Sequence, residues 1–326
     1  MARKTMRILV IGAGVVGSFN AARLFDGGQD VTLLARGQRL TELREHGVVM
    51  EDARTGQRTV TRVPLTDRVG PDDRYELALV VVRRNQIPSV LPMLARPNAV
   101  PAVLFLGNNA AGSEDLVQAL GRGRVLIGVV NAGGERKDGV VRYLSSKGPL
   151  TALQLTELDG RPTARSDRIL EAFRSSGLPA RFNPAVDEFL KTHAAGLPGF
   201  AGALYLAGGL RELAHRPDLL HLFLESMREC LRALRQLGIR LTPAAIRPLI
   251  FWVPLPVVAL GLRFFFQTTL AKVGGESHAN AAPDEMKELA DEFRDLIRRA
   301  GTSAPASERL FAAVDARAAT ARAVAG

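Results

Sequence analysis

The 326-residue sequence contains a single cysteine, Cys230, and only five histidines. One thiol excludes an internal disulfide framework and a thiolate metal cluster, and it favours a reducing compartment. No two histidines have the spacing that would bring both imidazoles to one metal ion. We therefore expect a cytoplasmic protein without a metal site.

Lysine is scarce as well, so the formal net charge of +10 comes almost entirely from scattered arginines. Scattered charge does not form the basic stripe that a nucleic-acid partner requires. Helix-turn-helix, zinc-finger and aromatic-basic patterns are also missing from the sequence. We expect no nucleic-acid partner.

Long apolar runs are limited to residues 248–266, PLIFWVPLPVVALGLRFFF. Three prolines interrupt helix hydrogen bonds there, and two flanking arginines leave about 15 apolar residues where a membrane span needs about 20. We expect no membrane partner. The run reads as a buried or interface segment, with Trp252 and the phenylalanines at 264–266 in the core or in a homodimer contact.

Short apolar runs alternate with helical stretches from Met6 to about Lys147. Runs of Val, Ile and Leu without polar alternation are typical of strands buried on both faces, and helices between them indicate a parallel sheet. This pattern predicts an α/β fold, with a Rossmann-type doubly wound sheet in residues 1–182. A hairpin at 48–63 is expected on the surface, and residues 183–326 are predicted to form an all-helical domain.

The stretch ILVIGAGVVGSFNAARLF places a Gly-x-Gly-x-x-Gly run after the first strand and at the start of a helix. In this context Gly12 permits a tight turn, Gly14 lets main-chain N–H groups approach a pyrophosphate, and Gly17 allows close helix–strand packing. The expected phosphate-binding residues are Gly12, Ala13, Gly14, Val15, Val16 and Gly17.

The second strand, DVTLLAR, ends about twenty residues later with Arg36, followed by Arg39. An acidic residue at this point would accept a hydrogen bond from the ribose 2′-hydroxyl of NAD, whereas a guanidinium fits a 2′-phosphate. The sequence therefore predicts NADPH as the cofactor. The alternative is that both arginines are solvated loop charges.

The order GAGVVG, LLARGQRL, VVVRRNQ, LGNNAAGSEDL and then FLKTHAA resembles the ketopantoate reductase (2-dehydropantoate 2-reductase) family. The resemblance covers most of the chain and is weakest beyond about Gly208. It implies a two-domain NADPH enzyme that transfers hydride to the keto carbon of a small 2-keto acid. It also implies that a lysine of the helical domain protonates the resulting alkoxide.

The resemblance also suggests roles for individual residues. Arg83 and Gln86 correspond to the family's cofactor-binding lysine and glutamine. Asn108 corresponds to the asparagine at the nicotinamide ribose and substrate. Lys191 corresponds to the catalytic lysine, and Glu285 to a late glutamate placed near that lysine.

The chain departs from the family at several polar positions. Ala195 and Gly199 stand where the family has asparagines, and Asn109 replaces a glycine. The family's substrate-binding serine falls on Val273 by ungapped counting. We expect a divergent member with a more apolar substrate pocket.

Reduction of a carbonyl requires a proton donor, and Lys191 is our candidate general acid. Pro198 leaves the carbonyl of Ala194 without its helix hydrogen bond, and this break one turn after Lys191 favours a shaped cavity there. A surface lysine is the ordinary alternative. His193 is a rival donor that points about 200° away on the same helix. His278 is considered only as a substrate contact. Two other functions stay open: an NADP-linked hydroxy or amino acid dehydrogenase, and a non-catalytic NADPH-binding sensor.

Overall fold

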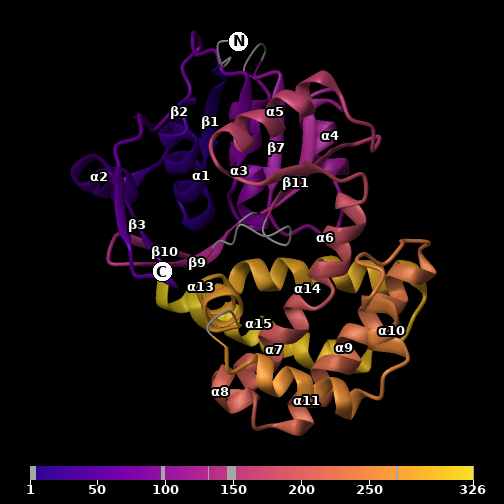
Figure 1. Cartoon of the computed structure of the whole chain (residues 1–326). Helices are drawn as coiled ribbons and strands as arrows, with labels where there is room; N and C mark the ends of the chain where they lie inside the picture. Colours follow the sequence, from indigo (N-terminus) through magenta and orange to yellow (C-terminus); the bar gives the residue numbers. More distant parts are fainter. Residues whose placement is uncertain (1–4, 97–99, 131, 145–151, 269–270, 326) are drawn as a thin grey trace. The chain divides into compact units, whose positions relative to one another are not determined.

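The computed structural model of the chain describes residues 5–96, 100–130, 132–144, 152–268 and 271–325 (Figure 1). The chain divides into two compact units. The first comprises Met1–Gly107 and Ser113–Val186, and the second comprises Asn108–Gly112 and Asp187–Gly326. The loop Asn108–Gly112 therefore belongs to the second unit, although the residues before and after it in the sequence belong to the first.

The first unit is built on an eight-stranded sheet. Neighbouring strands are parallel, as predicted, except β11 and β8, which pair antiparallel at this edge. The chain reaches β11 from β8 through a β-hairpin, and antiparallel neighbours need no helical crossover. In spatial order the strands are β12 (Ala180–Phe182), β11 (Leu153–Glu157), β8 (Val125–Val129), β7 (Ala102–Leu106), β6 (Leu77–Val80), β1 (Arg7–Ile11), β2 (Asp30–Leu34) and β5 (Leu65–Thr66).

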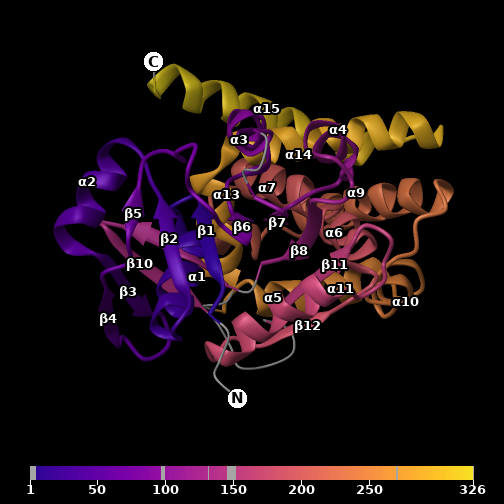
Figure 2. The same ribbon diagram turned by 90° about the horizontal axis from the view of Figure 1, so that it is seen from above.

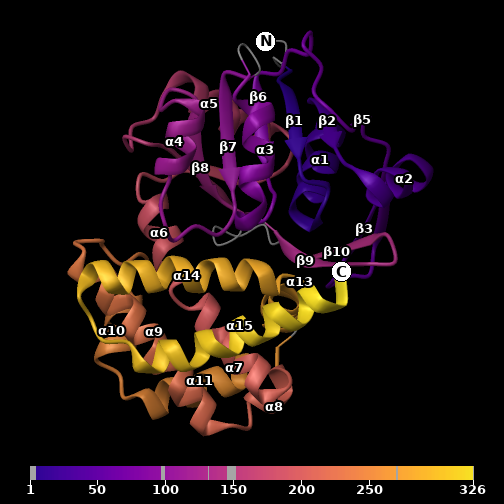
Figure 3. The same ribbon diagram turned by 180° about the vertical axis from the view of Figure 1, so that it is seen from behind.

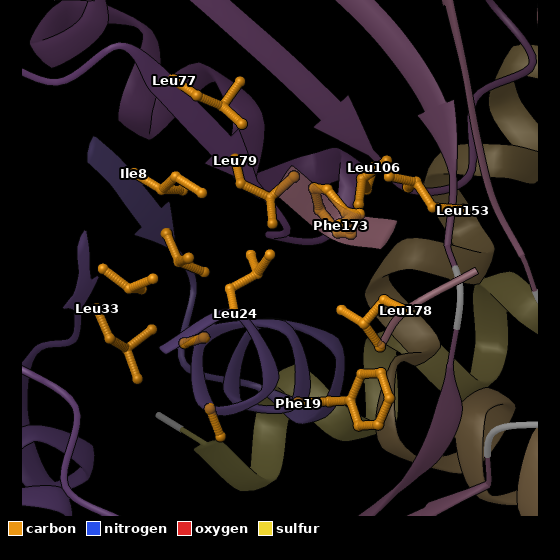
Figure 4. Packing of buried hydrophobic residues seen from close by; sticks show 14 of the residues in the cluster. Ile8, Phe19, Leu24, Leu33, Leu77, Leu79, Leu106, Leu153, Phe173 and Leu178 are labelled. Atoms are coloured by element: carbon orange, nitrogen blue, oxygen red, sulfur yellow. The ribbon is translucent and has the colours of Figure 1, made fainter. Parts of the chain in front are cut away.

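Helices cover both faces of this sheet, which confirms the predicted Rossmann-type fold class. Figure 2 shows α1 (Val15–Asp26) and α5 (Ala164–Ser175) on one face, and α3 (Ile87–Leu94) and α4 (Glu114–Leu120) on the other. Leu24 of α1 points toward strand residues such as Ile8 and Leu79, all of them fully buried (Figure 4). Burial of continuous apolar strands between two helical layers explains why these strands lack polar alternation. The first unit also contains two further helical elements, α2 (Gly37–His46) and the 3₁₀ turn η1 (Arg84–Gln86).

A second, four-stranded sheet lies beside α1. It has the order β4 (Arg58–Thr61), β3 (Val48–Asp52), β10 (Val140–Leu144) and β9 (Gly133–Lys137). The predicted hairpin at 48–63 is present, but its expected surface position is wrong. Met50 is fully buried, because β3 pairs with β10 and the sheet packs on α1.

The described residues of the second unit contain helices and no strand, as the sequence predicted. Its first helix begins at Val186, after a local turn in which Oδ1 of Asn183 accepts a hydrogen bond from the N–H of Ala185 at 3.0 Å. The elements are α6 (Val186–Ala194), α7 (Leu197–Ala207), α8 (Leu210–Leu213), α9 (Pro217–Gln236), α10 (Ile246–Phe251), α11 (Leu255–Phe265), the π-helix η3 (Lys272–Glu276), α13 (Ser277–Ala281), α14 (Pro283–Ala300) and α15 (Pro305–Ala325).

The last two helices are held to the middle of this unit by α7 and α9. Helices α14 and α15 run side by side (Figure 3), and α15 packs on α7 where Gly202 leaves no room for a Cβ beside the carbonyl of Leu310. Buried Glu229 of α9 accepts hydrogen bonds from the N–H groups of Ala306 (3.1 Å) and Ser307 (2.8 Å). These bonds satisfy donors of the first turn of α15, which would otherwise be buried without partners. None of the helices in the described part of the chain has the length and apolar content for a membrane crossing.

Candidate functional site

The glycine turn between β1 and α1 depends on two glycines with no space for a side chain. Gly12 has a φ of +111°, and a Cβ there would lie 2.9 Å from the carbonyl oxygen of Val81. A Cβ on Gly17 would overlap the carbonyl oxygen of Gly12. These two positions therefore bring the first turn of α1 close to the strand end, which is what the motif requires of them.

Gly14 has the opposite surroundings. It is the N-cap of α1 without a side-chain cap, and a Cβ placed on it would meet no atom within 4 Å. Val15 and Val16, the first helical residues, follow it directly. Uncapped N–H groups and open space at a helix N-terminus suit the approach of an anion, so this turn fits a dinucleotide pyrophosphate.

The two arginines after β2 have different surroundings. Arg36 is exposed at the N-cap of α2, and it makes no ion pair with any described residue. The Arg39 guanidinium instead donates to the carbonyl of Ala13 (3.2 Å) and to Oγ of Ser18 (3.3 Å), and it pairs with Glu42. Burial is the main cause that lowers the pKa of Arg39. Arg36 thus fits an extra phosphate, while Arg39 holds the glycine turn.

The residues that follow β6 form the 3₁₀ turn η1, and Arg83 is the N-cap residue of this turn. Arg83 is half-buried, and its main-chain N–H donates to Oε1 of Gln86 at 3.3 Å. Arg84 points elsewhere, since its Nη1 pairs with Oδ2 of Asp115 on α4 at 2.9 Å. Of this arginine pair, the structure places Arg83 together with the predicted Gln86.

In the helical unit, Lys191 lies on α6 with a largely buried side chain. Its Nζ forms an ion pair with Asp187, one helical turn earlier. The expected neighbour was Glu285, and the pairing with Asp187 differs from that expectation. The i, i+4 spacing of an acid and a lysine was a sequence signal for this pair.

Asn108, Glu285 and His278 come together within the second unit. Nδ2 of Asn108 donates to Oε1 of Glu285 at 3.3 Å and lies 3.4 Å from Nε2 of His278. The other carboxylate oxygen of Glu285, Oε2, is 3.5 Å from the same imidazole nitrogen. Glu285 is almost fully buried, whereas His278 is partly exposed. The buried carboxylate of Glu285 thus holds the amide of Asn108 and the imidazole of His278 next to each other.

His193 lies near this cluster, although no direct bond joins them. Its ring stacks on Phe189 with centroids 6.1 Å apart and keeps accessible surface. The surrounding protein keeps water from the imidazole and so lowers the pKa of His193, and the charge of His278 lowers it further. A lowered pKa makes His193 a weaker candidate for the proton donor than Lys191, because less of its imidazole is protonated near pH 7.

Glu292 is a residue of the site that the sequence did not single out. Its Oε2 accepts from the main-chain N–H groups of Ala110 (2.9 Å) and Ala111 (3.2 Å), just after Asn108. Glu292 lies two turns after Glu285 on α14, and residues seven apart share one helix face. Both buried carboxylates therefore hold the loop that contains Asn108. Their seven-residue spacing was the sequence signal that could have identified Glu292.

The positions that depart from the family are mostly interior. Ala195 is fully buried, and a Cβ on Gly199 would lie 2.8 Å from Oγ of Ser226. Asn109 closes its own loop, with Nδ2 2.8 Å from the Gly112 oxygen and Oδ1 2.9 Å from the Gly112 nitrogen. Val273 is buried within η3.

A cavity of about 660 Å³ opens elsewhere in the helical unit, beside the end of α9. Its lining includes Arg235, Arg240 and Arg247 but none of the predicted site residues. It has no part in the arrangement described above. The predicted cofactor residues lie in the first unit, apart from Asn108, and the proton-donor candidates lie in the second.

Comparison with known proteins places these features in context. Residues 8–157 match the family model described as Ketopantoate reductase PanE/ApbA. The 2-dehydropantoate 2-reductase of Archaeoglobus fulgidus is 28% identical over 178 residues, which is 54% of this chain and 56% of that protein. The enzyme of the same name from Pyrococcus horikoshii is 26% identical over 151 residues, 42% of this chain and 44% of that protein. These alignments span only about half of each relative's length.

Solved structures match nearly the whole chain. A putative ketopantoate reductase from Ralstonia solanacearum MolK2 has a TM-score of 0.74 at 21% identity, covering 97% of this chain and 99% of that chain. D-mandelate dehydrogenase in a ternary complex with NADH and anilino(oxo)acetate has a TM-score of 0.75 at 17% identity, covering 96% and 98%. At these identities the likeness establishes the shared fold.

Proposed function

We propose that this chain is a divergent member of the ketopantoate reductase family and an NADPH-dependent oxidoreductase that reduces the carbonyl of a small keto acid or related ketone. The match of residues 8–157 to the family model and the likeness to the archaeal enzymes and the solved structures support this proposal. The observation that carries the proposal is the open, uncapped turn at Gly14, followed by exposed Arg36 at the end of β2. Together they provide an anion site and a free guanidinium at the spacing a dinucleotide phosphate needs.

The first unit would bind the cofactor. The N–H groups after Gly14 bind the pyrophosphate, Arg36 binds the 2′-phosphate, and Arg39 keeps the turn in place through Ala13. Arg83 and Gln86 are the remaining cofactor contacts that we propose on this unit. When bound, the nicotinamide ring supplies the hydride.

The second unit would supply the proton and orient the substrate. Hydride addition leaves negative charge on the carbonyl oxygen, and a positioned acid lowers that barrier. We assign this role to Nζ of Lys191, which forms an ion pair with Asp187 on α6. Asn108, held by Glu285, orients the polar end of the substrate. His193 is the second candidate for the proton donor.

The substrate class follows from the same residues. Ala195 and Gly199 offer no side-chain hydrogen bond to a hydroxylated substrate, so we favour 2-keto acids with an apolar substituent over 2-dehydropantoate. The D-mandelate dehydrogenase structure, solved with NADH and anilino(oxo)acetate, supports testing aromatic 2-keto acids. It also makes NADH the cofactor to compare with NADPH.

Two alternatives stay open. The enzyme could work in the oxidative direction on a hydroxy or amino acid with NADP. A non-catalytic NADPH sensor would also bind through Gly14 and Arg36, and the missing asparagines favour it. A cytoplasmic location, inferred from the single cysteine, stays a prediction.

The test is an absorbance assay of NADPH oxidation with a panel of 2-keto acids, together with Lys191→Ala. We expect NADPH binding to be preserved and turnover to fall by about 100-fold or more, as for loss of a general acid. Lys287→Ala is the matched control, because Lys287 forms the same one-turn ion pair with Asp291 on α14. An unchanged rate in Lys191→Ala removes the lysine from its role. Tight NADPH binding without turnover on any substrate favours the sensor.

A further inference from the structure

The outer side of α10 and α11 carries an unusual concentration of exposed apolar side chains. Among the described residues, nine large hydrophobic side chains are exposed, and six of them lie between Leu249 and Phe265. Trp252 is 73% exposed and Phe264 is 65% exposed, so of the two expected places, the core or a homodimer contact, the core is excluded for these two residues, whereas Phe266 is buried. The six, which we call the α11 face, are Leu249, Trp252, Val257, Leu260, Phe264 and Phe265.

Helix α11 is apolar on two opposite sides. Its inner side packs on α9 and buries Leu255 and Val258. On its outer side Val257, Leu260 and Phe264 follow the i, i+3, i+7 spacing of a single stripe, and all three are exposed. A helix that is apolar all round is ordinarily covered on every side, but no described residue of this chain covers the stripe.

We propose that the α11 face pairs with the same face of a second copy of this chain, forming a homodimer. The stripe itself carries no charge, as the centre of a protein interface requires. Gly261 lies beside Leu260, and a Cβ there would meet no atom within 4 Å. A side chain of the other copy can therefore approach the backbone of α11 at this position, and a two-fold axis repeats the contact on the other copy.

The area of the face agrees with a stable dimer. With about 150–250 Å² for a whole aromatic residue, the exposed fractions of its three aromatic residues already correspond to roughly 300–400 Å². Leu249, Val257 and Leu260 enlarge this toward the about 800 Å² that each partner contributes to a standard interface. In Figures 1 and 3, α11 runs along the border of the helical unit that lies away from α14, where a second copy can approach it.

A membrane surface is the other occupant to test. No acidic residue occurs between Glu229 and Glu276, so the surroundings of the face are basic. However, a helix that lies on a membrane surface has one apolar face and one strongly charged face exposed to water. The second face of α11 is instead apolar and buried in the protein. The second copy is therefore the occupant that the described contacts favour.

Trp252 is the only tryptophan of the chain, so its fluorescence reports on this face directly. We expect sedimentation velocity to give a dimer at micromolar concentration. Over the same concentration range, the Trp252 emission should shift to shorter wavelength and acrylamide quenching should weaken several-fold. Val257→Glu should give monomers with fully quenchable Trp252. Val60→Glu is the matched control, since Val60 and Val257 are both 59% exposed and Val60 lies on β4.

A monomer at high micromolar concentration overturns the proposal, and so does a dimer whose Trp252 stays fully quenchable. Monomers that float with vesicles of phosphatidylcholine and phosphatidylglycerol also overturn it and assign the face to a membrane. Should Val257→Glu fail to fold by circular dichroism, the concentration dependence of wild-type Trp252 emission decides the question alone. None of these readings depends on NADPH, so they stand apart from the test of the reductase function.

Discussion

Nε of Arg39 donates to the main-chain oxygen of Ala13 at 3.2 Å, so the segment after β2 holds the glycine turn directly. The same guanidinium reaches Oγ of Ser18 on α1. Arg36, three residues earlier, is left exposed. Two arginines that look alike in the sequence therefore have separable roles.

The first prediction separates these arginines. Arg36→Asp should weaken NADPH binding by about 10-fold or more, because it removes a charged hydrogen bond to the 2′-phosphate, and should leave NADH binding nearly unchanged. Arg39→Ala should weaken both cofactors together and lower the melting temperature. Calorimetric titration with each cofactor measures the difference. Equal use of both cofactors by the wild type would contradict the assignment of Arg36.

The second prediction compares two glycines of the same turn. Gly14→Ala should fold with little change in melting temperature, since its Cβ meets no protein atom, yet bind NADPH at least about 10-fold more weakly, because the methyl group enters the pyrophosphate space. Gly17→Ala should destabilise the fold by about 1–3 kcal/mol or more, because its Cβ meets the Gly12 carbonyl. Thermal melts with and without NADPH test both. Full NADPH affinity in Gly14→Ala would sink the pyrophosphate assignment.

The third prediction concerns Glu292 as a positioning residue. Glu292→Gln should lower turnover on the order of 10-fold to 100-fold, because the loop that carries Asn108 loses a charged acceptor and shifts. NADPH binding through the first unit should be unchanged. Asp291→Asn is the control, because Asp291 is exposed and points about 100° away from Glu292 on α14. If turnover stays at the wild-type level while only the melting temperature falls, Glu292 has a purely structural role.

The fourth prediction uses the lone cysteine. Burial raises the pKa of Cys230 to about 12 from 9.0, so its thiol stays protonated in the folded chain. At pH 8 it should react with a disulfide reagent at least about 100-fold more slowly than in the unfolded chain. Above about pH 9 the unfolded chain loses this proton and the folded chain keeps it, so the free energy of unfolding should fall there. Rapid native labelling would show that the α9 region opens readily.

Much of the first unit could be predicted because its signals are local. The sequence predicted a strand, a glycine turn and the start of a helix, and α1 begins at Val15 as expected, because these signals lie within a few residues of one another. The second sheet could not be predicted. It joins β3 to β10, about ninety residues apart, and nothing in either strand identifies its partner. The hairpin at 48–63 therefore seemed to be a surface feature.

The candidate site divides in the same way. The sequence alone determined the glycine turn, the arginine at the end of β2 and the lysine helix, because neighbours along the chain set these features. Only the tertiary structure decided that Asn108 joins Glu285 and His278 in the helical unit, and that Glu292 holds the same loop. These groups are about 170 to 180 residues apart, and the packing of buried carboxylates, which need hydrogen-bond donors, brings them together.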